Sequence, residues 1–133
     1  MVVDDTVERR RGKRIHAKSC YREAVRSTPK HVVKGFGVKG VCLMRLVRLP
    51  WSSRLWALPF LTVLAPSEPA NRAAKKRHKT TVDWTCQRVK AVSRWVRRPW
   101  VLLGDGSFAC LRLGWTGVQH QVVSISRLRL DAQ

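Results

Sequence analysis

The stretch TTVDWTCQRVKAVSRWVRRPWVLLG, at residues 80–104, predicts a helix followed at once by a buried strand. Thr80 precedes the helix and Asp83 stands three residues later, which is the spacing of a capping box. Apolar residues recur at helical spacing, Pro99 ends the helix, and the run 100–103 is wholly apolar. The apolar stripe consists of Val82, Cys86, Val89, Val92 and Val96. We therefore expect an α/β protein in which this helix packs on a sheet.

The residues on either side predict the other strands of that sheet. β-branched residues favour a strand at 2–6, and two apolar runs at 41–49 and 54–65 flank the turn sequence PWSS at 50–53. A last strand is expected at 121–125. A hairpin followed by helix-linked strands indicates a mixed sheet with flanking helices.

Two segments between these strands carry weaker signals. CYREAV, at residues 20–25, is compatible with one helical turn that would end before Pro29. SEPANRAAKKRHK, at residues 67–79, is polar and basic and is expected to form a loop.

The charge of the chain restricts its partners. Lys and Arg number 27 against 8 Asp and Glu, so the formal net charge of the 133 residues is +19. Such a field attracts polyanions such as DNA and RNA.

The sequence shows no membrane-spanning or signal segment. The longest apolar run, Leu55–Ala65, is too short for a membrane helix and contains Pro59. The start of the chain also lacks an apolar signal segment, so we expect a soluble protein without a membrane partner.

Acidic residues end two of the expected strands. Asp4 and Asp5 follow two valines, and Asp105 follows the apolar run 100–103 between two glycines. Neighbouring strands would bring these carboxylates together, and Mg²⁺ would offset their repulsion by binding their oxygens. Taken singly, each Asp is more often a cap or a turn residue. Because the four cysteines form no C-x-x-C pair, a zinc site is not expected.

Seven motifs, in this order, resemble DDE-type transposases of bacterial insertion sequences. The resemblance covers essentially the whole chain. The motifs are VVDDT (2–6), ERRRGKRI (8–15), KHVVKGFGVKG (30–40), RLWALPFLTVLAPSE (54–68), KRHKTTVDW (76–84), VLLGDGSFA (101–109) and SRLRLDA (126–132). The resemblance implies a ribonuclease-H-like mixed sheet with flanking helices, incomplete here. Its first catalytic acid lies on the first strand and its second ends the fourth.

The resemblance also assigns the site residues. Asp4 matches the first acid through the pattern D-x-[ST], with Asp5 as second choice, and Asp105 matches the second acid. Both are expected to hold Mg²⁺ or Mn²⁺ for DNA cleavage and strand transfer in transposition. The family's third acid, a Glu, would lie beyond Gln133. The chain is thus expected to be residues 1–133 of a partial catalytic domain, without the preceding DNA-binding segment and inactive alone.

One segment of this chain departs from the pattern of the family. Gly114 and Gly117 interrupt the segment 111–121, which is a helix in the family.

The resemblance also implies the partners of the chain. They are insertion-sequence ends and target DNA in the nucleoid of a bacterial cytoplasm, and the intact family allows a homodimer. The expected DNA contacts are Arg9, Arg10, Arg11, Lys13, Arg14, Lys75, Lys76, Arg77, Lys79, Arg127 and Arg129.

Two rival interpretations remain open at this point. In the first, the chain is a non-enzymatic, basic nucleic-acid-binding protein whose acids only cap strands. In the second, it is an unstable fragment without function, because the last edge of its sheet is uncovered.

Overall fold

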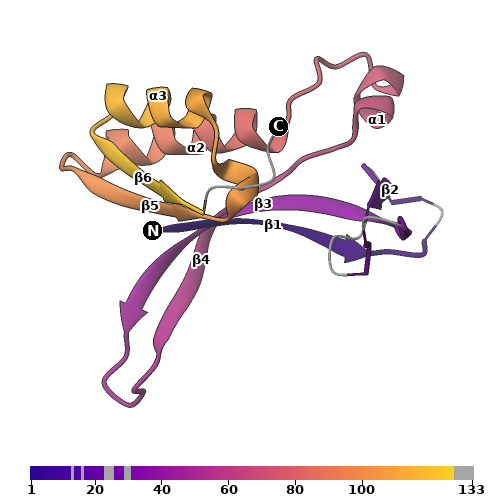
Figure 1. Ribbon diagram of the computed structural model, residues 1–133. Helices are drawn as coiled ribbons and strands as arrows, with labels where there is room; N and C mark the ends of the chain where they lie inside the picture. The colour runs from indigo at the N-terminus through magenta and orange to yellow at the C-terminus, as the bar shows by residue number, and fades with distance from the viewer. Residues whose placement is uncertain (13, 16, 23–25, 29–30, 128–133) are drawn as a thin grey trace.

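The computed structural model describes residues 1–133 except 13, 16, 23–25, 29–30 and 128–133. A mixed sheet and three α-helices make up this part of the chain, which confirms the expected α/β class (Figure 1). The strands are β1 (Val2–Arg9), β2 (Ser19–Arg22), β3 (Lys34–Arg48), β4 (Leu55–Leu64), β5 (Trp100–Gly104) and β6 (Val122–Ser126). The helices are α1 (Glu68–Ala73), α2 (Thr81–Trp95) and α3 (Leu111–Gln119), with a 3₁₀ turn η1 at Gly106–Phe108.

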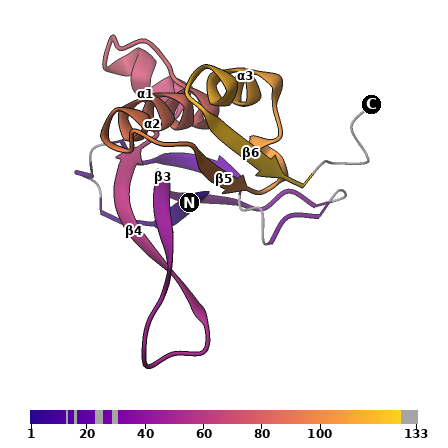
Figure 2. The same ribbon diagram turned by 90° about the vertical axis from the view of Figure 1, so that its left-hand side faces the viewer.

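The sheet joins an antiparallel part to a parallel part. Its order is β2-β3-β1-β5-β6, and β4 pairs with β3. β1, β3 and β4 pair antiparallel, whereas β5 is parallel to both β1 and β6. Helices α2 and α3 lie together over one face of the parallel part (Figures 1 and 2).

The core lies between these two helices and the sheet. Val3, Leu43 and Leu102 come from the strands and are at most 2% exposed, and Val89 and Val92 meet them from α2. Burying one such side chain stabilises the fold by about 1.5–3 kcal/mol. The predicted apolar stripe of α2 is confirmed, since its members are buried in this core or packed against it.

The predicted start of α2 is also confirmed. The Thr80 hydroxyl accepts a hydrogen bond from the Asp83 backbone N–H, and the Asp83 carboxylate accepts one from the Thr80 N–H. This reciprocal pair satisfies two N–H groups at the helix start. In the described part of the chain, no helix is long and apolar enough to cross a membrane.

Two predictions for the connecting segments were wrong. Cys20–Arg22 belongs to β2, which pairs antiparallel with the start of β3, so strand pairing outweighs the weak local helical signal. The remaining residues of that segment, 23–25, lie outside the described residues. The expected loop at 67–79 contains α1, where Ser67 caps the helix by accepting a hydrogen bond from the Ala70 N–H.

β5 differs from the fully buried strand that its composition predicted. Trp100 and Leu102 are buried, but Val101 between them is 41% exposed. Since α2 and α3 both lie on one face of the parallel part, alternate residues of β5 point away from them.

α3 forms in spite of its two glycines. At Gly117 an added Cβ would lie 2.6 Å from the carbonyl oxygen of Val122, so the glycine lets the helix lie directly against β6. Gly114 has open space around it. Close packing on the sheet thus outweighs the low helix propensity of this segment.

The hairpin of β3 and β4 extends beyond the body as an arm, defined here as residues 45–58 (Figures 1 and 2). Its turn, at 50–53, lies where the sequence PWSS predicted it, and β4 is the predicted returning strand. The register shifts between Leu43 and Met44, where the hairpin leaves the helix-covered region.

Candidate metal and nucleic-acid site

The parallel pairing of β1 and β5 brings two of the predicted acids to one place. Val2 is in register with Leu103, and the Leu103 N–H donates to the Met1 carbonyl oxygen at 2.9 Å. One residue further along, a Cβ added to Gly104 would lie 3.3 Å from Cγ1 of Val3. The next residues along the two strands are Asp4 and Asp105, so their backbones lie at neighbouring positions.

The structure separates Asp4 from Asp5. Successive side chains of a strand point to opposite faces, and the burial of β1 follows this rule. Asp5 lies on the face of buried Val3, and Lys39 Nζ is 2.8 Å from its Oδ2. Asp4 is exposed on the other face and pairs with no side chain among the described residues. Asp4 is therefore the carboxylate of this pair that is open to a cation.

Asp105 has a structural role in the turn that follows β5. Its Oδ1 accepts hydrogen bonds from the Ser107 N–H at 3.0 Å and from the Ser107 hydroxyl at 2.5 Å. These bonds cap η1, as the turn interpretation of Gly104-Asp105-Gly106 requires. They also hold the carboxylate in one orientation, and both end on the same oxygen.

Among the described residues, the two carboxylates that could bind a metal at this site are those of Asp4 and Asp105. Within this part of the chain, no three side chains of His, Cys, Asp or Glu come together as a metal site. Mg²⁺ commonly binds through one or two carboxylates and keeps water or phosphate as its other ligands. The pair Asp4 and Asp105 fits this mode in residue type.

The first group of predicted DNA contacts lines a basic hollow at the end of β1. Figure 1 shows that β2 lies beside this end of β1. Arg9, Arg10 and Arg11 lie on the wall of the hollow, and its volume is about 450 Å³. Arg14 is exposed and is not part of the wall, and Lys13 lies outside the described residues. Three further basic residues of the wall were not predicted from the sequence, because only the folded chain brings their separate segments together. They are Lys18, Arg26 and Lys34.

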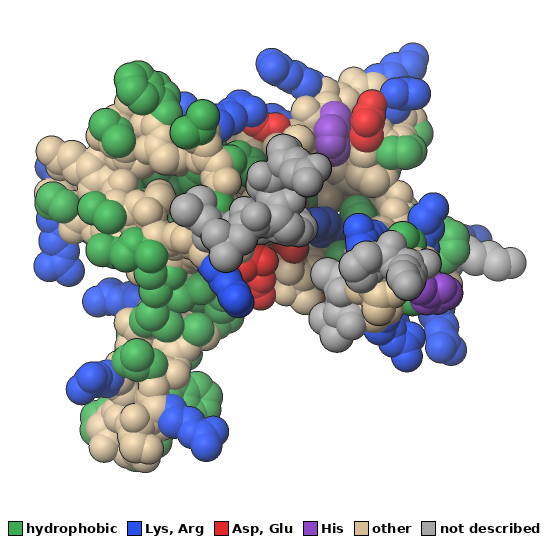
Figure 3. Space-filling model, in the orientation of Figure 1, with side chains coloured by type: hydrophobic (Ala, Val, Ile, Leu, Met, Phe, Trp, Pro, Cys, Tyr) green, Lys and Arg blue, Asp and Glu red, His purple; other side chains and the backbone are tan. Residues whose placement is uncertain are grey.

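The second group surrounds the start of α2. Arg77 and Lys79 line a hollow of about 250 Å³ together with Lys90 and Arg112, whose positions in the sequence gave no sign of this proximity. Lys75 and Lys76 are exposed outside it. Arg127 is exposed beyond β6, whereas Arg129 lies outside the described residues. Figure 3 shows Lys and Arg side chains spread over this face of the molecule, with acidic side chains in its middle.

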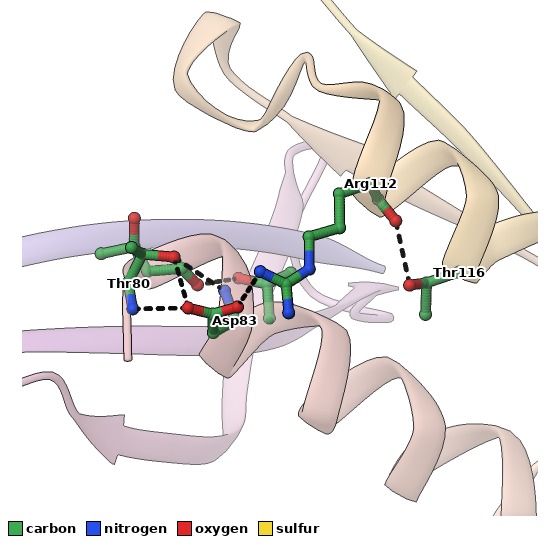
Figure 4. A network of polar contacts seen from close by, with 6 residues as sticks. Thr80, Asp83, Arg112 and Thr116 are labelled. Atoms are coloured by element: carbon green, nitrogen blue, oxygen red, sulfur yellow. Dashed lines mark hydrogen bonds and ion pairs between the residues drawn. The ribbon is translucent and has the colours of Figure 1, made fainter. Parts of the chain in front are cut away.

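Asp83 is held within the second group by a polar network (Figure 4). Its Oδ2 accepts hydrogen bonds from the Thr80 N–H at 2.8 Å and the Thr80 hydroxyl at 2.9 Å, and its Oδ1 pairs with Arg112 of α3. The Thr80 backbone hydrogen bond, helped by the hydroxyl and by Arg112 and Arg77, lowers the pKa of Asp83. Asp83 therefore links α2 to α3 and is not a candidate metal ligand.

Comparison of the chain with protein-family models, with curated proteins and with solved structures finds no match.

Proposed function

We propose that this chain is part of the ribonuclease-H-like catalytic core of a DDE-type transposase. In this proposal Asp4 and Asp105 hold Mg²⁺ or Mn²⁺ against a DNA phosphodiester. One observation carries it: the parallel pair β1–β5 aligns the strand of Asp4 with the strand that Asp105 directly follows.

The order of the strands supports the fold part of the proposal. Apart from the short β2, the described part of the chain forms three antiparallel strands, β1, β3 and β4, and then two parallel strands, β5 and β6. Asp4 lies on the first of these five and Asp105 directly follows the fourth. The resemblance implies these two positions for the first and second acids.

The chemistry follows from the residue types. Divalent cations held here would supply the chemistry of a two-metal site, in which the attacking oxygen is activated and the leaving oxygen of the phosphodiester is stabilised. Asp4 and Asp105 would supply oxygen ligands, and Asp105 is already oriented by Ser107. The arginines and lysines of both basic hollows would hold the DNA backbone by charge-assisted hydrogen bonds.

A metal titration of the full chain tests the proposal. Addition of Mg²⁺, or of paramagnetic Mn²⁺, is expected to perturb the NMR signals of Asp4 and Asp105 together. Asp4→Asn is expected to weaken binding by at least about tenfold, because a neutral amide replaces the exposed carboxylate. Asp5→Asn is the matched control and should bind normally, since Lys39 pairs with that carboxylate. A titration that leaves both signals unchanged, or equal losses in the two variants, would contradict the metal site.

The alternative function is that of a non-enzymatic, basic nucleic-acid-binding protein. The capping bonds from Ser107 favour it, because they give Asp105 a role that needs no metal. This alternative predicts strong, salt-dependent binding of nucleic acid together with no response of Asp4 and Asp105 to Mg²⁺.

A further inference from the structure

We propose that the basic hollow at the end of β1 binds an unpaired nucleic-acid strand, with its phosphates on Arg and Lys and one base stacked on Phe36. The proposal deepens the nucleic-acid part of the proposed function and rests on it. It does not depend on the metal site.

The charge of the hollow suits a phosphate backbone. Its wall contains the end of β1, the segment before β2, the segment between β2 and β3, and the start of β3. Glu8 offsets part of this charge, because its carboxylate is 2.5 Å from Arg10. The Lys18 ammonium donates to the Gly12 carbonyl oxygen at 2.7 Å, which holds this side chain over the connection after β1. The six basic residues of the wall are Arg9, Arg10, Arg11, Lys18, Arg26 and Lys34.

Phe36 adds a feature that a phosphate site alone does not need. Its side chain is 64% exposed although it stands on a strand that pairs on both sides, with Cys20 opposite it on β2. On the other side, the Arg10 N–H donates to the Phe36 carbonyl oxygen at 3.2 Å. The aromatic ring is therefore attached to rigid backbone among the basic residues of the wall.

This combination favours a single strand over a duplex. Proteins that bind single strands pair a positive groove with exposed aromatic rings, because every base has a face that can stack. In a duplex the bases already stack on one another, so an aromatic ring on the protein gains nothing from them. The volume of about 450 Å³ is within the ordinary range for a small-ligand site.

The hollow also lies within reach of a strand held at Asp4. Arg9 follows Asp4 by five residues on β1, which corresponds to about 17 Å along an extended strand. An unpaired strand covers that distance in a few nucleotides, fewer than the roughly five steps that the axial spacing of about 3.4 Å within duplex DNA would give. The hollow would thus hold a strand several nucleotides from the proposed metal.

Fluorescence anisotropy with labelled oligonucleotides tests the proposal, in EDTA so that the metal site plays no part. We expect Phe36→Leu to weaken binding of a 15-nucleotide single strand by about 5- to 10-fold and to leave duplex binding unchanged. Trp115→Leu is the matched control, because that ring is 66% exposed on α3, away from this hollow. Lys34→Ala should weaken binding of both forms and lower the salt dependence by about one phosphate contact.

Abasic oligonucleotides provide a test that needs no variant. The unmodified chain should bind an abasic single strand about as weakly as Phe36→Leu binds the normal one. Equal affinity for normal and abasic strands, or an equal loss of duplex and single-strand binding in Phe36→Leu, would overturn the stacking proposal. A failed metal titration would leave these measurements unaffected, so the two proposals fail separately.

Discussion

Strand β3 passes through two regions that differ in what covers them. In the body, Val41 and Leu43 are fully buried between the sheet and the helices. In the arm, the partner strand β4 presents Leu55, which is 58% exposed, and Trp56, which is 48% exposed. Both regions consist of paired, largely apolar strands, so hairpin pairing alone does not make a core. We infer that the helices over the body supply most of the stability.

The largest expected effect is in the body. Leu43→Ala should lower the free energy of unfolding by about 2–5 kcal/mol, because it leaves a cavity where Leu43 meets the core. Urea denaturation followed by circular dichroism measures this loss. A loss below about 1 kcal/mol would mean that the helices do not close tightly over the sheet.

An intermediate effect is expected where α2 begins. Asp83→Asn weakens the cap on Thr80 and removes the charge that pairs with Arg112, so we expect a loss of about 1–2 kcal/mol. Because the folded-state pKa of Asp83 is lowered, its contribution is complete above about pH 4 and is lost as the pH falls through that folded value. Denaturation at a series of pH values should therefore show the variant and the original chain converging in acid.

A matched control for this prediction is Glu68→Gln. Glu68 forms an exposed i,i+4 pair with Arg72 at 3.0 Å, and such pairs contribute less than about 0.5 kcal/mol. If Glu68→Gln lowers the free energy of unfolding as much as Asp83→Asn does, then carboxylates stabilise this basic chain wherever they stand, and the cap has no special effect.

The smallest effect is expected in the arm. Leu55→Ala should change the free energy of unfolding by less than about 0.5 kcal/mol, because most of this side chain is already in contact with water. Denaturation at several protein concentrations checks the prediction. A loss above about 1.5 kcal/mol that grows with concentration would show that another copy of the chain covers the arm.

The fold was predictable where local signals agree with one another. The capping pair Thr80 and Asp83, the apolar stripe of α2 and the turn after β3 each follow from spacing within a few residues. β2 was missed because four residues carry little intrinsic preference, and the pairing with β3 decides their structure. α1 was missed because a polar, lysine-rich segment has no apolar stripe to reveal a helix.

The candidate site was predictable in its residue types but only partly in its members. The expected position of each acid at a strand end indicated Asp4, Asp5 and Asp105 from the sequence. For Asp4 and Asp5 that expectation was wrong, because β1 continues to Arg9 through its pairing with β3. The three added residues of the basic hollow, Lys18, Arg26 and Lys34, had no shared spacing that could connect them.

The sequence by itself determined the α/β class, the charge of +19 and the start of the main helix, because these depend on composition and on neighbours a few residues apart. Only the tertiary structure decided that Asp5 pairs with Lys39 while Asp4 stays open, and that Phe36 stands among cations from four segments. The physical reason is register: which side chains meet across a sheet depends on how distant strands align, and no local preference specifies that alignment.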